Sequence, residues 1–477
     1  MKQINKQDAN KNLFKNTGII AIGQLSTQVL NFFLLPLYTS LLTTYEYGIL
    51  DLLTTYSSLL SVLIGLQISQ AVFRFLVTKR DRPENLRKTI STVVITSEGI
   101  GVIYVILFSI LQLFLSIQFK WFLLVHVIST LALQITSNIA RGLGDNIKYA
   151  KANFISSLII VVLNVIFVAI FHLGVLAMLI AYILGPTVGF VYLVYNCKIY
   201  SYVKKCWFDK NELIKILRYS IPLIPNELSW SVMHSSDRWI VSYFMGVAQN
   251  GLIAVASKFS LIYTTFFSIF NKSWTEQVVL HYKEEGGAEY VNEMFGKMTI
   301  LFATLASGII ACMPFVFNFL VDKQFGKAYG LIPLYLVAVF FNAIIGMVSA
   351  IYLIENETKQ VAMSTTIAAI INVIVGLMLI RWIGVYAAPI SSIVAYITIS
   401  IWRMVDVNKR HCKINISLKD SIILIGLFLI SLFIFFTNQI IIKCITFLIF
   451  ILIAFIENYR LLKDLFYSIS KSNVSDK

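Results

Sequence analysis

Apolar residues recur in long, nearly unbroken runs along most of the chain, from about residue 14 to residue 457. The runs reach about 20 residues or more, the length with which an α-helix crosses a hydrocarbon core of about 30 Å. Continuous runs favour helices, because the strands of a membrane barrel show short segments of alternating polarity instead. The pattern predicts helices over 14–42, 47–77, 89–117, 119–140, 154–172, 174–196, 217–244, 251–278, 293–321, 330–354, 361–380, 383–405, 420–437 and 439–457. The predicted fold class is therefore an all-α, polytopic membrane protein with 14 transmembrane helices.

Short sequence segments recur at a nearly constant offset of just over 200 residues. Leu173–Ala177 matches Ile383–Ala387, Asn164–Ile166 matches Asn372–Ile374, and Gly48–Leu50 matches Gly251–Ile253. These matches predict two pseudo-symmetric halves of six helices, residues 1–205 and 206–410, and an additional helix pair with a tail in 411–477. Because six is even, both halves begin on the same side of the membrane and would be parallel repeats. Such an arrangement predicts a cavity between the halves that opens to each side in turn.

Composition supports the membrane assignment. Hydrophobic residues make up 58% of the chain, charged residues only 13%, and the mean hydropathy is +0.79. The net charge of +15 does not indicate nucleic-acid binding, because the basic residues lie in short segments between apolar runs. With the N-terminus inside, 30 of the 39 lysines and arginines lie in cytoplasmic segments and five lie outside. We therefore expect a multi-pass protein of a bacterial cytoplasmic membrane with both termini in the cytoplasm, in contact with membrane lipids.

Sequence signatures of enzymes, metals and cofactors are missing. The five cysteines have neither CxxC nor Cys/His metal spacing, and the five histidines include no HExxH. There is no Walker A sequence, and the 141–145 segment lacks the strand and the third glycine of a dinucleotide site. We expect no metal, no cofactor and no catalytic residue.

Ionisable residues inside the predicted helices are the candidate functional residues, because charge at membrane depth costs several kcal/mol unless it lines a polar interior. Two helical stripes stand out: Glu227, Ser231, His234 and Arg238 in helix 217–244, and Lys258, Thr265, Lys272 and Glu276 in helix 251–278. Both stripes would face one water-filled cavity. Asp237 should point elsewhere, and the alternative is that Asp237 and Arg238 are structural and tie their helix to a neighbour.

Fewer ionisable residues lie in the first half. Arg74 either contacts substrate or extends to the interface, and Lys15 either contacts substrate or anchors the topology. Glu98 would bind a proton in hydrocarbon, which suits proton coupling, or would form an ion pair. Asp51 lies near the outer interface, where we expect it to be solvated.

Two prolines, Pro222 and Pro225, lie at the cytoplasmic end of helix 217–244. Proline kinks membrane helices, so this end is a candidate gate of the inner mouth. The alternative is a fixed structural kink.

Three segments resemble a known family: Tyr219–Asn226, Ser236–Gly246 and Arg141–Ala150. They are similar to the Wzx-type flippases of polysaccharide repeat units, in the multidrug/oligosaccharidyl-lipid/polysaccharide (MOP) superfamily. The resemblance covers most of residues 10–405 and implies the MATE-like fold of that superfamily. It implies transport of an undecaprenyl-diphosphate-linked oligosaccharide for O-antigen (lipopolysaccharide), capsule or exopolysaccharide synthesis.

The resemblance also implies a mechanism and partners. Such flippases are associated with a cationic lumen, for which Arg238, Lys258, Lys272 and Arg74 are the matching bases here. It further implies coupling to H⁺ or Na⁺, and delivery of the repeat unit to a polysaccharide polymerase with its chain-length regulator.

Three other functions share part of this pattern. A MATE-type drug antiporter would share the twelve-helix core but favour acidic groups in the cavity, and a lipid II flippase belongs to the same superfamily. A membrane polysaccharide polymerase, the enzyme alternative, should carry a long external loop with arginines, and no such loop is present.

Overall fold

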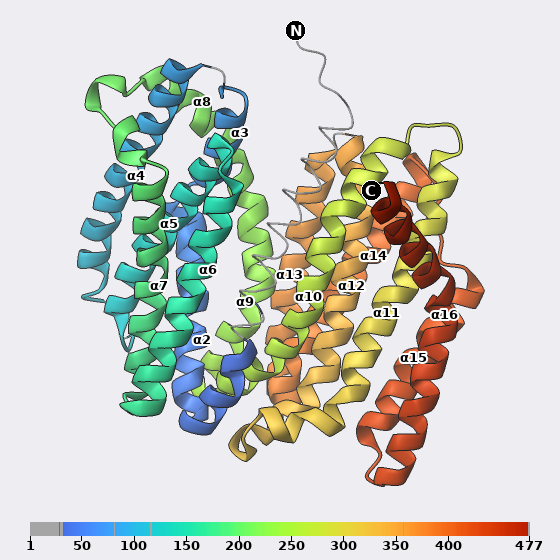
Figure 1. The fold of residues 1–477 in the computed structure, drawn as a ribbon. Helices are drawn as coiled ribbons and strands as arrows, with labels where there is room; N and C mark the ends of the chain where they lie inside the picture. The colour runs from blue at the N-terminus through green and yellow to red at the C-terminus, as the bar shows by residue number, and fades with distance from the viewer. Residues whose placement is uncertain (1–27, 29–31, 81, 115–116, 356, 476–477) are drawn as a thin grey trace. The chain divides into compact units, whose positions relative to one another are not determined.

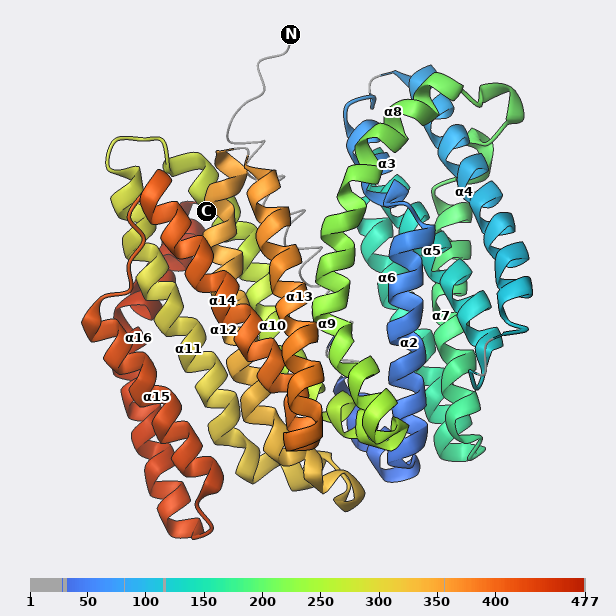
Figure 2. The same cartoon turned by 180° about the vertical axis from the view of Figure 1, so that it is seen from behind.

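The computed structural model describes residue 28 and residues 32–80, 82–114, 117–355 and 357–475. Long helices dominate all of these ranges (Figures 1 and 2). The chain forms two compact units, Met1–Ala254 and Val255–Lys477, and each is described by itself. The boundary between the two units falls inside one long helix, Val247–His281. The two lobes predicted from the sequence repeat, 1–205 and 206–410, stay a prediction.

The first unit is a bundle of helices that begins, within the described residues, with the short helix Phe32–Leu41. Its helices are α2 (Thr44–Ile64), α3 (Ile68–Val77), α4 (Pro83–Leu111), α5 (Lys120–Leu143), α6 (Asn146–Asn164), α7 (Gly174–Asn196), α8 (Lys210–Ser220), α9 (Ile224–Met245) and the first turns of α10 (Val247–His281). Helix α7 packs against α5 and α6, α3 packs against α5, and α2 contacts both α5 and α9. A short π-helix, Val165–Ile170, continues α6.

The second unit contains the rest of α10 and six further helices. These are α11 (Gly287–Leu320), α12 (Ile332–Ile354), α13 (Thr358–Ile383), α14 (Ala387–Arg410), α15 (Leu418–Phe436) and α16 (Ile440–Ser475). Helix α14 packs against both α12 and α13, and α15 packs against α11. The hairpin of α15 and α16 is joined to α11 through a small apolar core of Ala311, Leu427, Ile434 and Phe450.

Within the described residues the predicted helices are confirmed, with two differences. The helix predicted over 47–77 is two helices, because Leu66 and Gln67 adopt left-handed backbone angles of φ 45° and 53° between α2 and α3. Helix α8 was not predicted as a separate element. Most of the first predicted helix, 14–42, and Lys15 lie outside the described residues. By length and composition, 11 described helical stretches could span a membrane, and α9, with its three charged residues, is not among them.

The sequence repeat has structural counterparts. Gly174 and Gly384, which are equivalent in the repeat, both have positive φ, 58° and 59°; Gly174 is the first residue of α7, and Gly384 is the first residue of the turn that leads into α14. Asn164 at the end of α6 and Asn372 in α13 are both buried, and each amide group donates a hydrogen bond, to Ile160 O and Ser392 Oγ respectively. Equivalent residues therefore occupy equivalent positions in two helix pairs, α6–α7 and α13–α14.

The third repeated pair, Gly48 and Gly251, lies at a crossing of α2 with the start of α10. A Cβ on Gly48 would overlap the carbonyl oxygen of Val247, and a Cβ on Gly251 would overlap that of Thr44. The contact is reciprocal, since each glycine meets the carbonyl four residues before the other. Only glycine permits this close approach of two backbones.

Candidate functional site

Arg238 lies at the centre of a polar cluster formed by α2, α9 and the start of α10. Its Nε donates to Asp51 Oδ2 at 2.8 Å, and its Nη1 contacts Asp237 Oδ1 at 3.3 Å and donates to the carbonyl of His234 at 2.8 Å. Asn250 of α10 donates to Asp51 Oδ2 at 3.3 Å and to the carbonyl of Gly48 at 3.1 Å. We call Asp51, Asp237, Arg238 and Asn250 the arginine cluster.

The charged side chains of the arginine cluster are largely buried. The exposed fractions of the side chains are 16% for Arg238, 18% for Asp51 and 3% for Asp237. The expectation of a solvated Asp51 is therefore wrong. Its carboxylate forms an ion pair with Arg238, which lies 187 residues away in the sequence. Asp237 likewise does not point away from Arg238 but accepts hydrogen bonds from its backbone and its guanidinium. One base and two acids meet here, so the cluster by itself is not a cationic site.

The rest of the predicted stripe on α9 is partly accessible. Glu227 and Ser231 are half-buried, and His234 is exposed and stacked on Trp230. Glu227 Oε1 accepts a long hydrogen bond of 3.4 Å from Gln70 of α3. The helix runs without interruption from Ile224 to Met245, so the predicted alignment of these side chains on one face is retained.

The predicted stripe on α10 is not uniformly open. Lys258 and Glu276 are half-buried and Lys272 is exposed, but Thr265 between them is only 8% exposed. The hydroxyl of Thr265 donates to the carbonyl of Leu261 at 2.7 Å, as in an ordinary membrane helix. Lys272 is therefore the most accessible of the predicted bases on this helix.

Arg74 and the two prolines lie near the α8 end of the first unit. Arg74 is exposed in the last turn of α3, and its guanidinium lies 4.4 Å from the ring centre of Tyr219 on α8. Pro222 falls in the 3-10 turn between α8 and α9, and Pro225 in the first turn of α9. Proline is well tolerated at the start of a helix, so the two prolines separate α8 from α9 without breaking α9.

Glu98 lies about halfway along α4 on its exposed side. Its neighbours three or four positions away along the helix carry no polar side chain, since they are Val94, Ile95, Gly101 and Val102. Among the described residues no hydrogen bond or ion pair to its carboxylate is found. The charge of this carboxylate is therefore not offset by a polar neighbour on its own helix.

Sequence reasoning did not single out the buried Arg403 of α14. This side chain is 1% exposed. Its guanidinium donates to Ser364 Oγ at 3.0 Å, Ser349 Oγ at 2.5 Å, Thr365 Oγ1 at 2.9 Å and the carbonyl of Val361 at 3.0 Å. In the part of the chain that the structure describes, no carboxylate forms an ion pair with it. The signal in the sequence was an arginine within an apolar helix, but its hydroxyl partners belong to two other helices.

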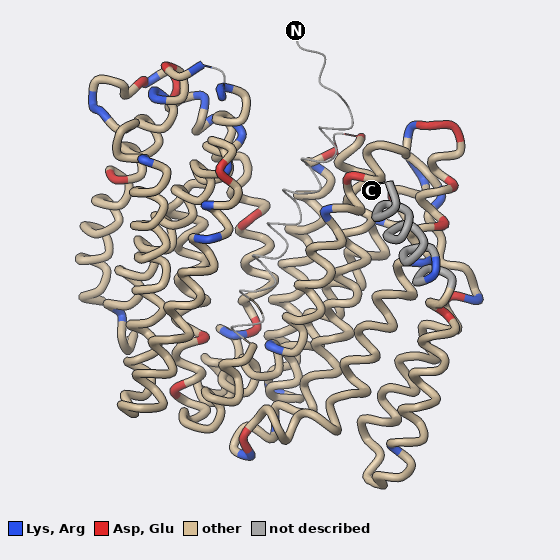
Figure 3. Tube along the Cα trace, viewed as in Figure 1, with Lys and Arg blue, Asp and Glu red and all other residues tan. Residues whose placement is uncertain are grey.

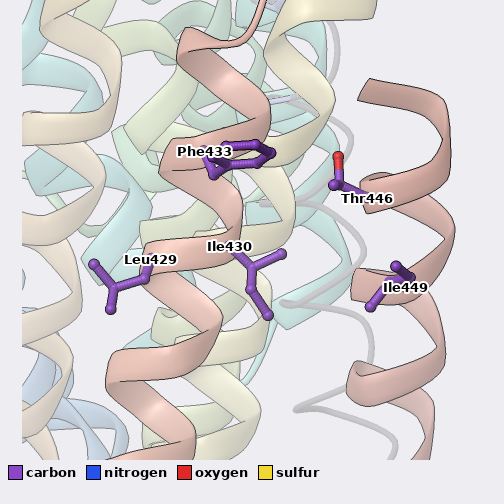
Figure 4. Close-up of a pocket in the computed structure, with 5 residues that line it drawn as sticks. All are labelled: Leu429, Ile430, Phe433, Thr446 and Ile449. Atoms are coloured by element: carbon purple, nitrogen blue, oxygen red, sulfur yellow. The ribbon is translucent and has the colours of Figure 1, made fainter. Parts of the chain in front are cut away.

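No metal site emerges from the described residues. Within them, no group of three or more His, Cys, Asp and Glu side chains could hold a metal ion. A groove of about 450 Å³ between α15 and α16 is lined by Leu429, Ile430, Phe433, Thr446 and Ile449 (Figure 4). The Thr446 hydroxyl donates to the carbonyl of Ile442, so this groove offers hydrocarbon contacts and no charge.

Comparison with protein families gives one match. The model of a family described as "Polysaccharide biosynthesis protein" matches residues 13–274, more than half of the chain. No individually curated protein matches the chain.

Solved structures share the fold. A lipid II flippase MurJ, in an inward closed conformation, aligns with a TM-score of 0.70 and 16% identity over 93% of this chain and 99% of that one. An inward-facing MATE-family multidrug resistance transporter of the MOP superfamily aligns with a TM-score of 0.65 and 17% identity over 82% of this chain and 98% of that one. At these identities the likeness concerns the fold alone, and it agrees with the predicted architecture.

Proposed function

Because the chain belongs to the polysaccharide biosynthesis protein family and has the fold of the MOP superfamily, we propose that it flips undecaprenyl-diphosphate-linked oligosaccharide repeat units across the membrane. The direction is from the inner to the outer leaflet of a bacterial cytoplasmic membrane, with both termini in the cytoplasm. The family match over residues 13–274 is the observation that carries this proposal. The flipped units would serve O-antigen, capsule or exopolysaccharide synthesis and pass to a polymerase and its chain-length regulator.

Physical chemistry supports a protein-lined path. A diphosphate-sugar headgroup is large and anionic, and hydrocarbon gives it no hydrogen bonds or counter-charge. Ionisable side chains on α9 and α10, inside or next to membrane-length helices, could provide both. One structure with this fold is named as a flippase of lipid II, which supports a lipid-linked substrate. The polyprenyl chain of the substrate needs only apolar surroundings and can stay in the bilayer.

The predicted residues take different parts in this proposal. Lys272, Lys258 and Arg74 are the candidate contacts for the diphosphate, and Lys15, outside the described residues, stays a candidate. We assign Arg238 a positioning role, because it already engages Asp51 and Asp237.

Coupling to an ion and gating are separate parts of the proposal. Glu98 is the favoured group for coupling to protons, with Glu227, Glu276 and Asp237 as the other candidates. Pro222 and Pro225 remain candidates for a gate.

A MATE-type drug antiporter is the second candidate function, since such a transporter shares the fold over 82% of this chain. Lipid II flipping is a variant of the first candidate. Drug sensitivity of a strain that lacks the protein distinguishes the antiporter from both flippases.

The deciding experiment measures the level and sidedness of undecaprenyl-diphosphate-linked oligosaccharide in a strain that lacks this protein. Accumulation on the cytoplasmic face, relieved by the wild-type chain but not by Lys272→Gln, supports flipping and the lysine contact. Accumulation of lipid II instead would move the substrate to the peptidoglycan precursor. Absence of any accumulation, with increased sensitivity to cationic drugs, would replace flipping with drug export.

A further inference from the structure

The segment that joins α7 to α9 in the first unit is held firmly against α4. The hydroxyl of Ser91 donates to the carbonyl of Lys204 at 2.6 Å and accepts from its N–H at 3.1 Å. Thr92 Oγ1 accepts from the N–H of Asp209 at 3.0 Å, and Thr89 Oγ1 donates to Glu212 at 2.8 Å. These three residues of α4, Thr89, Ser91 and Thr92, are fully buried. The segment is thus a fixed surface and not a loose loop.

Helix α8, within this segment, is anchored at its start and along one face. The carboxylate of Asp209 accepts from the N–H groups of Glu212 and Asn211, and these bonds hold the pKa of Asp209 below its usual value. Glu212 forms an ion pair with Lys79, which follows α3. Asp209 and Glu212, the two acids of this segment, are therefore occupied by structural contacts.

The opposite face of α8 is exposed and combines two chemistries. Lys210, Lys215 and Arg218 supply positive charge, and Ile214 and Ile221, which directly follows the helix, are 47% and 49% exposed. Bases beside large aliphatic side chains suit the boundary between headgroups and hydrocarbon, because the long stems of lysine and arginine cover apolar surface while their charged ends stay among polar groups.

An aromatic clamp continues this surface onto α4. The ring centre of Trp207 lies 5.2 Å from the guanidinium of Arg87 and 4.9 Å from the ammonium of Lys204. Tryptophan favours the membrane interface, where its ring meets hydrocarbon and its edge meets water. Two bases fixed beside such a ring would lie at headgroup level.

The charge balance of this end is strongly positive. Residues 79–88 and 198–218 contain eleven lysines and arginines and four acids. Figure 3 shows the charged residues of the first unit gathered where α3, α4 and α8 meet, while the middle of the bundle carries few.

We propose that the exposed face of α8 (Lys210, Ile214, Lys215, Arg218) and the Trp207 clamp together bind anionic phospholipid headgroups of the leaflet on this side. The bases would contact the phosphates, and the isoleucines would reach the upper acyl chains. By the positive-inside rule this leaflet is the cytoplasmic one. This surface goes beyond the proposed function, because it concerns bulk lipid and does not depend on what the protein transports.

The test compares two triple variants of the full chain with equal loss of charge. The platform variant is Lys210→Gln/Lys215→Gln/Arg218→Gln, and the control is Lys409→Gln/Lys413→Gln/Lys419→Gln, whose residues are also exposed but lie in the second unit. Each protein is reconstituted in nanodiscs of phosphatidylcholine with increasing phosphatidylglycerol, and the phosphatidylglycerol retained after transfer to detergent is measured by mass spectrometry. Equal melting temperatures establish that the variants are folded.

We expect the platform variant to retain at least about fivefold less phosphatidylglycerol than wild type, and the control to retain nearly the wild-type amount. The difference should shrink at about 1 M salt, where the screening length is about 3 Å. Arg87→Gln/Lys204→Gln should give a smaller loss of the same kind. Equal losses in the platform and control variants would overturn the proposal in favour of a general charge effect, and no loss in either would reject lipid binding at this surface.

Discussion

The ion pair between Arg238 and Asp51 allows the structural and transport roles of Arg238 to be separated. Arg238→Ala removes the guanidinium and leaves two carboxylates whose side chains are only 18% and 3% exposed. Breaking a buried pair by removing one partner typically costs about 3–5 kcal/mol, mainly because a buried charge is left without compensation. We therefore expect Arg238→Ala to lower both the amount of folded protein and transport, so the single variant cannot identify a substrate contact.

The double variant Asp51→Asn/Arg238→Gln, compared with the single variants Asp51→Asn and Arg238→Gln, tests this reasoning. Asp51→Asn alone should cost about 1–2 kcal/mol, because Arg238 keeps Asp237 and the carbonyl of His234. The double variant replaces the ion pair with two amides that can bond to each other and to Asn250, so its cost should fall below the sum of the single changes by about 1.5–3 kcal/mol. Stability is measured by thermal unfolding in nanodiscs, and transport by complementation of a deletion strain.

Two outcomes would decide the role of Arg238. If the double variant is as abundant as wild type and also transports, Arg238 acts by holding α2 against α9. If abundance returns but transport does not, the guanidinium contacts the headgroup. Stability effects that add within about 0.5 kcal/mol would refute the coupling between Arg238 and Asp51 altogether.

The other predictions concern single sites. Gly251→Ala should destabilise the protein by about 1–3 kcal/mol, because its Cβ would overlap the Thr44 carbonyl. The control Gly426→Ala should not, because the space around Gly426 is open. Equal melting temperatures of the two variants would contradict the close crossing of α2 and α10. Arg403→Lys should cost about 2 kcal/mol, because one ammonium cannot replace bonds to both α12 and α13, and an unchanged melting temperature would contradict this. Glu98→Gln should leave stability within about 0.5 kcal/mol but abolish the stimulation of transport by a proton gradient in proteoliposomes; retained stimulation assigns coupling to another group.

The helices were predictable because membrane length and continuous hydrophobicity are local properties of the sequence. The repeat was also readable, since Gly174 and Gly384 need the same backbone conformation and therefore keep the same residue type. The break between α2 and α3 was missed, because Gly65, which caps α2, is a residue common inside membrane helices, and Leu66 and Gln67 are neither glycine nor proline.

The candidate site was predictable only in part, for a physical reason. Helical spacing shows which side chains share a face of one helix, so the stripe of α9 was visible. It does not show which helix lies opposite, so neither the Asp51 partner of Arg238 nor the hydroxyl shell of Arg403 could be found. The burial of Thr265 shows the same limit, since a polar residue in a polar stripe can bond to its own helix.

The arginine cluster changes where a cationic path should be sought. A diphosphate is stabilised by uncompensated positive charge, yet Arg238 lies with two carboxylates and so contributes none while those pairs persist. Either the headgroup displaces Asp51 from the guanidinium, or the attraction comes from other bases. Displacement would separate α2 from α9 and leave a carboxylate beside an anion, which is unfavourable on both counts. We therefore infer that Arg238 is not the group that attracts the headgroup, and that the arginine cluster maintains the packing of α2, α9 and α10 around the Gly48–Gly251 crossing.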